Sequence, residues 1–222
     1  MLETERFILR PWREADAPTL FRWASDPRGG PPANWAPYVS VEHAREVLHA
    51  VYCAPDTFAI CMKRPEEFDA ATVSSIEGKA DFGDMTRGFS GRAFLRERKK
   101  VASAPLNPIG SIRFVKPDHA NCVIGGNDRE MGIWLAAPFW GFGIAPEVAG
   151  AMLRYGFGER GLSAIWVCNF VENATSARAK DKLGFELVRL EEATNPVTGV
   201  VRTQQVSVLT KSSWENMRKA TE

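Results

Sequence analysis

The sequence lacks a long hydrophobic run. Its longest stretch without a charged residue covers sixteen residues, from Met131 to Pro146, and is interrupted by Pro138, Gly141 and Gly143. A helix that crosses a bilayer needs roughly 20 apolar residues. The first residues, Met1–Glu14, are rich in charge and contain no apolar segment of the kind found in secretory signals. We therefore expect a cytoplasmic protein without a membrane segment.

An excess of charge of one sign is also missing, and cysteine and histidine are few. Lys and Arg number 28 against 27 Asp and Glu, a net charge of +1, whereas nonspecific nucleic-acid binding depends on many cationic contacts to phosphate. We expect no direct nucleic-acid binding. The cysteines and histidines are not spaced as zinc ligands, so we expect reduced thiols and no metal site. These residues are Cys53, Cys61, Cys122, Cys168, His43, His49 and His119.

The composition is otherwise that of an ordinary folded domain. Of the 222 residues, 45% are hydrophobic and 25% are charged, which excludes collagen-like, coiled-coil and wholly disordered chains. The length is sufficient for one domain with a substantial core. No internal repeat is visible.

Strand and helix patterns alternate along most of the chain. β-Branched and aromatic runs between turn residues predict strands, and apolar residues at helical spacing predict helices. Asp16, Ser40 and Asn173 are predicted N-caps, and Ser212-x-x-Glu215 is a predicted capping box. The strands are expected at 6–11, 57–62, 108–116, 129–136, 164–171, 185–190 and 200–210, and the helices at 17–24, 41–51, 146–160, 174–183 and from 212 onward. This order predicts an α/β fold with a sheet of mixed direction and helices on its faces.

Residues 64–107 interrupt this alternation. They combine short apolar pieces, a polar and Gly-rich middle, and a basic end, Arg92–Lys100. Structureless connections of this length are unusual inside a compact domain. We therefore predict a single domain, residues 1–222, with an insertion at about 64–107. The basic end fits either an acidic partner or a solvated face.

The segment Phe139–Glu147 is the first candidate site. Gly141 and Gly143 permit a tight turn with exposed backbone N–H groups, and Pro146 suits the first position of the helix that follows. Such a helix start binds anions. The segment lacks the third glycine of a dinucleotide-binding fingerprint and the Lys of a P-loop. A glycine turn that only lets the strand and the helix pack is the alternative.

Further motifs follow this turn in a characteristic order. After one strand comes Asn173-Ala-Thr-Ser176, and then Gly184-Phe185. Here the sequence resembles the GCN5-related N-acetyltransferase (GNAT) superfamily, and within it the group of the RimJ and RimL type. The resemblance covers nearly all of the chain outside the insertion. Its segments are Leu2–Trp12, Ile109–Ser111, Gly132–Leu135, Trp140–Ala145, Asn173–Ser176 and Lys182–Phe185.

The resemblance implies acetyl-coenzyme A (acetyl-CoA) as co-substrate and a mostly antiparallel sheet with a splayed central strand pair. The glycine turn would hold the pyrophosphate through its backbone, the strand before it would hold the pantetheine arm, and the later motif would line the other wall. These groups are, in turn, Gly141, Phe142, Gly143, Ile144 and Ala145; Ile133, Trp134 and Leu135; and Asn173 and Ser176. A plain helix N-cap is the alternative role for Asn173.

The sequence departs from the family pattern at two places. Trp140 and Phe142 stand where polar or basic residues are frequent, so phosphate binding must depend on backbone donors. Lys180 stands where many members have a tyrosine that protonates the leaving thiolate. The acid is thus not identified by the family pattern, and Ser176 is our candidate.

Acetyl transfer also requires a neutral amine, and Glu130 is our candidate base, acting directly or through water. A backbone N–H near Leu135 would stabilise the oxyanion. A solvated charge at the strand end is the alternative role for Glu130, and Cys168 is expected to be a buried, inert thiol.

The sequence thus predicts an N-acetyltransferase that transfers an acetyl group directly to a primary amine, with a protein or peptide N-terminus favoured over a small amine. We expect a monomer or a homodimer. Two other functions remain open: a noncatalytic acyl-CoA-binding or regulatory module, and an interaction domain whose loop, residues 64–107, docks a partner.

Overall fold

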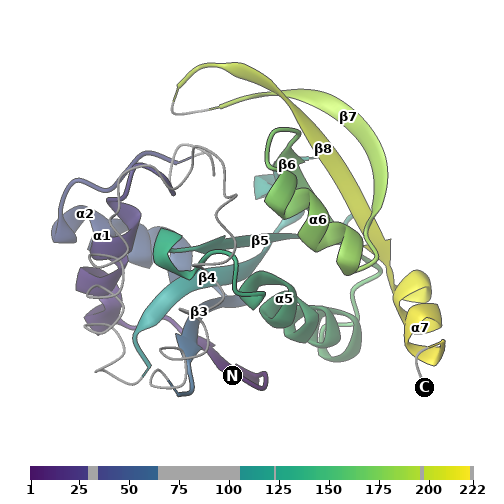
Figure 1. The fold of residues 1–222 in the computed structure, drawn as a ribbon, viewed down its shortest axis with the longest axis horizontal. Helices are drawn as coiled ribbons and strands as arrows, with labels where there is room; N and C mark the ends of the chain where they lie inside the picture. Colours follow the sequence, from purple (N-terminus) through teal and green to yellow (C-terminus); the bar gives the residue numbers. More distant parts are fainter. Residues whose placement is uncertain (30–34, 65–105, 123, 196–197, 221–222) are drawn as a thin grey trace, which may run out of the picture.

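The structure, a computed structural model, describes residues 1–29, 35–64, 106–122, 124–195 and 198–220. The predicted insertion and its basic end lie almost wholly outside these ranges and stay a prediction. Within the described residues, eight strands form one sheet in the order β1-β2-β3-β4-β5-β6-β8-β7 (Figure 1). The strands are β1 (Leu2–Glu3), β2 (Phe7–Pro11), β3 (Thr57–Met62), β4 (Pro108–Val115), β5 (Arg129–Leu135), β6 (Ala164–Phe170), β7 (Glu186–Thr194) and β8 (Val201–Thr210).

Helices cover both faces of the sheet, as predicted. All six residues of β3 are buried, and they alternate between two apolar clusters. Phe58 and Ile60 pack with residues of α5 (Ile144–Arg154). Ala59 and Cys61 pack with α1 (Ala17–Ala24) and α2 (Val41–Val47) on the opposite face. None of the helices in the described ranges is long and apolar enough to cross a membrane.

The parallel pair β5–β6 is the exception in an otherwise antiparallel sheet. β5 and β6 pair only at Arg129–Ile165 and Glu130–Trp166, after which they separate. β6 instead pairs with β8 at seven positions. The predicted splayed central pair is confirmed.

β6 is not buried along its whole length. Its middle residues, 166–169, are only partly buried, because β8 pairs with them on one side and the gap lies on the other.

Two of the predicted caps, Ser40 and Asn173, are confirmed. The Ser40 hydroxyl accepts the His43 N–H at 3.0 Å at the start of α2. Asn173 caps α6 (Ala174–Lys182) in the same manner, through the Ser176 N–H at 3.0 Å. Gly184, just after α6, has φ +82°, as expected of a glycine C-cap.

Two helix starts and one capping contact differ from prediction. Asp16 makes no capping hydrogen bond to α1, because its carboxylate forms a buried ion pair with Arg10 at 2.7 Å. Thr210, rather than Ser212, caps α7 (Lys211–Lys219), because β8 leads into this helix without a linker. α5 begins at Ile144 instead of Pro146. It ends at Arg154, and the chain continues directly into a π-helical turn, Tyr155–Glu159.

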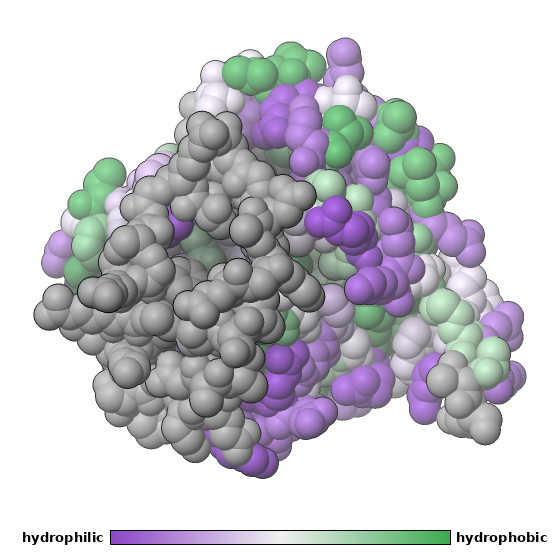
Figure 2. Space-filling model, viewed as in Figure 1, coloured by the Kyte–Doolittle hydropathy of each residue, from purple (hydrophilic) through white to green (hydrophobic). Residues whose placement is uncertain are grey.

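The β7–β8 hairpin extends beyond the body of the sheet (Figure 1). β7 is an edge strand, and apolar residues lie among the polar ones on this part of the surface (Figure 2). Leu187, Leu190 and Val201 are each more than half exposed. This apolar surface is compatible with both expected oligomeric states, and neither is tested.

Candidate active site

The glycine turn between β5 and α5 has the conformation of an anion-binding loop. Gly141 and Gly143 have φ values of +84° and +68°, in the left-handed region that favours glycine. Gly143 is the N-cap of α5, an eleven-residue helix. The N–H groups of Ile144 and Ala145 belong to its first turn and have no acceptor within the helix. The loop thus presents backbone donors at the positive end of a helix dipole.

Three side-chain contacts hold this loop in place. The Trp140 indole N–H donates to the Leu135 carbonyl at 2.7 Å, so the residue that replaces a polar one fastens the loop to β5. The Arg6 guanidinium donates to the Phe142 carbonyl at 3.1 Å and to the Glu147 carboxylate at 2.6 Å. Sequence reasoning missed Arg6, because it lies far from the loop in the chain and no local pattern marks it.

Along β5, the backbone N–H groups of alternate residues point toward β4 and toward the gap. The Ala136 N–H donates to the Ile109 carbonyl of β4 at 2.9 Å. Because hydrogen-bonded pairs alternate in antiparallel strands, Trp134 also pairs with β4, and Ile133 and Leu135 point their N–H groups toward the gap. Trp134 therefore does not offer its backbone to a ligand there, although the predicted roles of Ile133 and Leu135 stay possible geometrically.

Buried polar atoms without partners lie on both strands beside the gap. In the described part of the chain, the Trp134 indole Nε1 on β5 and the Asn169 Oδ1 on β6 are buried and have no hydrogen-bond partner. Buried polar groups are normally paired. The unpaired Asn169 acceptor, on the strand that borders the gap, fits a ligand that carries an amide N–H, and the pantetheine arm is such a group. The Trp134 indole lies on the opposite face of the sheet, beside Tyr52.

The start of α6 forms the end of the second wall. Asn173 is exposed, and its Oδ1 accepts the Ser176 N–H, so it acts as a plain N-cap. Ser176 is half-buried. Their contacts with acetyl-CoA, and the role of Ser176 as an acid, stay predictions.

Lys180, which replaces the expected tyrosine, has partners on β8. Its ammonium donates to Gln205 Oε1 at 2.5 Å and to Ser207 Oγ at 2.8 Å. Burial lowers the pKa of Lys180. The side chain thus helps to hold α6 against the sheet.

Glu130 lies where β5 and β6 separate. It is 3% exposed, so the interpretation as a solvated charge at the strand end is wrong. Its two carboxylate oxygens accept the backbone N–H and the side-chain amide of Asn121 at 2.5 and 2.6 Å. Burial raises the pKa of Glu130, although the Asn121 hydrogen bonds and the Arg113 charge act in the opposite direction. A raised carboxyl pKa is typical of a general base that works near neutral pH.

The chain also matches a known protein family, in addition to having a splayed strand pair, a glycine loop and a buried carboxylate. The family described as "Acetyltransferase (GNAT) domain" matches residues 6–186. The chain belongs to the GNAT acetyltransferase family. Membership supports acetyl transfer with acetyl-CoA as co-substrate. The finer assignment to the RimJ and RimL group is not part of this match.

Solved structures agree with the GNAT fold. A GNAT-family acetyltransferase from Bacillus anthracis has a TM-score of 0.64 at 18% identity, covering 95% of this chain and 98% of that one. A GCN5-related N-acetyltransferase from Brucella melitensis has a TM-score of 0.65 at 18% identity, covering 99% and 82%. Spermidine N-acetyltransferase from Vibrio cholerae, in complex with CoA and spermine, has a TM-score of 0.62 at 14% identity, covering 95% and 98%. At these identities the likeness concerns the fold alone. Among curated proteins, none matches.

Aromatic side chains line the α1–α2 side of this GNAT protein next to β5. The Trp134 ring lies 6.0 Å from Trp35 and 6.5 Å from Tyr52, and Tyr38 lies 5.4 Å from Trp35, between ring centroids. Glu130 projects from the same face of β5 as Trp134, since the two differ by an even number of residues. The candidate base and the aromatic group therefore share one side of the sheet.

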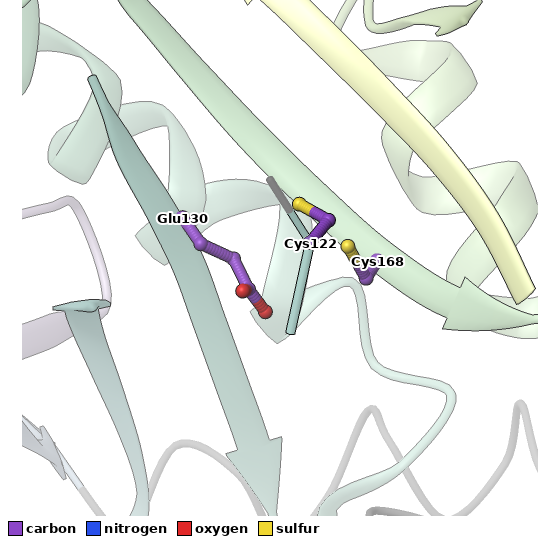
Figure 3. A group of neighbouring side chains, drawn as sticks. All are labelled: Cys122, Glu130 and Cys168. Atoms are coloured by element: carbon purple, nitrogen blue, oxygen red, sulfur yellow. The ribbon is translucent and has the colours of Figure 1, made fainter. Parts of the chain in front are cut away.

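Two thiols converge on this carboxylate. Cys122, Cys168 and Glu130 place their sulfur and oxygen atoms within 4.8 Å of one another (Figure 3). A hydrogen bond with Cys122, together with burial, raises the pKa of the Cys168 thiol. The sequence predicted a buried, inert thiol at Cys168. In the structure Cys168 is half-buried and lies beside a second thiol, that of Cys122. Sequence spacing gave no sign of this grouping.

Proposed function

We propose that this protein is an acetyl-CoA-dependent N-acetyltransferase of the RimJ and RimL type that acts on the primary amine of a protein or peptide N-terminus. One observation carries the proposal. The gap between β5 and β6 leads from the buried carboxylate of Glu130 along the free edge of β5 to the glycine loop at α5. An extended acyl-thioester ligand with a phosphate end suits such a path.

The residues of this chain divide the work of the reaction. Bound acetyl-CoA supplies the thioester whose acetyl group is transferred. Glu130 accepts the proton that the amine loses as its nitrogen forms the new C–N bond. The Leu135 N–H, which faces the gap, donates to the carbonyl oxygen as negative charge develops there. When the C–S bond breaks, Ser176 or water returns a proton to the sulfur.

The Arg113 charge near Glu130 favours an N-terminal amine over a polyamine. An α-amino group has a pKa near 8, against about 10.4 for a lysine-type amine, and is easier to deprotonate. Arg113 on β4 crosses over Gly132, and its charge acts on Glu130, Tyr38 and Tyr52. A polyamine with several positive charges would meet this cation, whereas a peptide N-terminus carries one.

The test is an acetyl-transfer screen against peptide N-termini, polyamines and aminoglycosides. Because Cys53 is exposed, thiol reagents also react with the protein, so product masses accompany the thiol-release assay. We expect acetylated peptides to be the main products. Acetylation of polyamines or aminoglycosides alone would overturn the substrate assignment, and the absence of acetyl-CoA binding would overturn the proposal as a whole.

A noncatalytic acyl-CoA-binding module is the second candidate. It is favoured by Lys180, whose ammonium is bound to Gln205 and Ser207 at the position of the expected tyrosine. This candidate predicts acetyl-CoA binding by calorimetry without release of CoA for any amine in the screen.

A further inference from the structure

The group formed by Cys122, Glu130 and Cys168 brings together three parts of the chain. Cys122 lies in the connection between β4 and β5, Glu130 at the start of β5, and Cys168 on β6 beyond its last pairing with β5. The three side chains point toward one another (Figure 3). Their ligand atoms all lie within 4.8 Å. Three potential metal ligands thus meet where the gap opens.

The distances suit a small tetrahedral ion. Zn²⁺ binds thiolate sulfur at about 2.3 Å and carboxylate oxygen at about 2.0–2.2 Å, so ligand atoms around it lie roughly 3.5–3.8 Å apart. Since the ligand atoms lie within 4.8 Å of one another, side-chain rotations that draw the three groups together by at most about 1 Å satisfy this geometry. Two thiolates also favour a soft or borderline ion over Mg²⁺ or Ca²⁺. Three protein ligands leave the fourth position open, as in catalytic rather than structural zinc sites.

The carboxylate is already oriented for such a role. Asn121 donates one hydrogen bond to each oxygen of Glu130, and an ionised carboxylate has about four acceptor positions. Lone pairs therefore remain for an ion. Partners of this kind fix metal ligands in their binding orientation. Asn121 also precedes Cys122 in the chain, so one short segment supplies a ligand and positions another.

An open pocket gives access to the group. It has a volume of about 330 Å³ and is lined by Pro117, Ala120, Asn121, Cys122, Ile124 and Glu191. Cys122 therefore belongs both to the wall of this pocket and to the three-residue group. A hydrated ion can therefore reach the Cys122 side of the group from this pocket.

We propose that Cys122, Glu130 and Cys168 form a binding site for a thiophilic divalent cation, Zn²⁺, beside the acetyl-transfer centre. The ion replaces the two thiol protons, which pass to solvent, and water fills the open position. No redox change is involved. One consequence rests on the proposed function: an ion that holds the Glu130 carboxylate withdraws the base, so Zn²⁺ inhibits acetyl transfer.

Metal binding is tested without acetyl-CoA or amine. The full chain, reduced and freed of metal, is titrated with Co²⁺ and, in competition with a chromophoric chelator, with Zn²⁺. We expect sulfur-to-cobalt charge-transfer absorption and one Zn²⁺ bound per chain. Cys122→Ser and Cys168→Ser should abolish the absorption and weaken Zn²⁺ binding by well over tenfold, and Asn121→Ala by about 10–100-fold.

Cys53→Ser is the matched control, because Cys53 is exposed and is not a member of the group; it should bind Zn²⁺ as the unmodified protein does. Thermal melting of each variant separates loss of the site from loss of the fold. Equal Zn²⁺ affinity in the unmodified protein and in folded Cys168→Ser would overturn the proposal. So would a reduced protein that binds no metal but forms a Cys122–Cys168 disulfide when treated with peroxide.

Inhibition is measured separately, as the fall in acetyl-transfer rate at Zn²⁺ concentrations that fill the site. If no acetyl transfer is found with any amine, the proposed function fails and the binding result stands. If transfer is found but Zn²⁺ does not bind, only the metal site fails.

Discussion

The glycine loop and the Glu130 pocket lie at opposite ends of one gap and are built on different principles. The loop is exposed at Gly141 and Gly143, and it acts through main-chain N–H groups whose direction depends on positive φ angles. The pocket acts through side-chain groups instead: the buried Glu130 and Cys122, the half-buried Cys168 and the exposed Asn121. The loop therefore tolerates a change of side chain that preserves its conformation, whereas the pocket tolerates almost none.

Glu130→Gln is the strongest test of this contrast. Loss of a general base typically lowers the rate by 10²–10⁴-fold, and we expect kcat/KM for the amine to fall by about that factor. Acetyl-CoA affinity by calorimetry should stay within about twofold, because the loop is untouched. Glu186→Gln, on the exposed edge strand β7, is the control and should change neither quantity. An unchanged rate in Glu130→Gln would exclude this carboxylate as the base.

Gly143→Val tests the other end of the gap. A β-branched residue at φ +68° costs about 1–2 kcal/mol or more, and relief of that strain turns the N–H groups of the loop away. We expect acetyl-CoA to bind about tenfold more weakly, with kcat at saturation nearly unchanged.

Gly161→Val provides the same backbone strain away from the site. Gly161 has φ +62° with open space around it, so this variant should lose similar stability and retain acetyl-CoA affinity. Equal losses of affinity in both variants would mean that general destabilisation, and not loop geometry, is responsible.

Trp140→Phe removes a single anchor of the loop. The indole donates to Leu135 at 2.7 Å, and a hydrogen bond of this kind contributes about 1 kcal/mol to stability. We expect the free energy of unfolding in urea to fall by about that amount and the KM for acetyl-CoA to rise a few-fold. A KM that stays constant would show that Arg6 alone is sufficient to hold the loop.

Glu147→Gln should have the smallest effect, a loss of folding stability that is seen in full only above about pH 5.5. Burial alone would raise the pKa of Glu147, but hydrogen bonds from Thr4 and Arg6, together with the Arg6 charge, lower it. A lowered folded-state pKa stabilises the fold above the unfolded value, about 4.3, and this contribution is lost as the pH falls further. The stability difference between the unmodified protein and Glu147→Gln should therefore be constant above about pH 5.5 and shrink toward pH 3.5 in urea titrations. A difference that grows in acid would contradict this assignment.

The sequence was sufficient for features that depend on local pattern. Most strand positions, the caps Ser40 and Asn173 and the glycine turn follow from residues within one turn of each other, and the structure bears them out. The short β1 was not predicted, and β7 continues to Thr194, beyond the predicted end at 190. Asp16 is a case in which local pattern is not sufficient. It stands at the N-cap position of α1, but its carboxylate pairs with Arg10 on β2 and makes no capping hydrogen bond. A buried ion pair outweighs a capping bond worth about 1 kcal/mol.

The pocket could not be predicted because it depends on contacts across the sheet. Cys122 and Cys168 belong to segments that meet only after β5 and β6 have paired at Glu130–Trp166. Their spacing in the chain matches no metal motif, so the pattern of cysteines carried no information about their neighbours. The Arg6 contacts with the glycine loop could not be predicted for the same reason, because they join segments far apart in the chain.

The position of β8 also determines when the site can form. β6 is held at seven positions by β8 and at only two by β5, yet β8 is the last strand along the chain. During synthesis on the ribosome, β6 emerges before its main neighbour, β8. The second wall of the gap can therefore form only after residues 201–210 have been synthesised. We expect the ligand groove to be among the last parts to fold, so a nascent chain that stops before β8 should not retain acetyl-CoA.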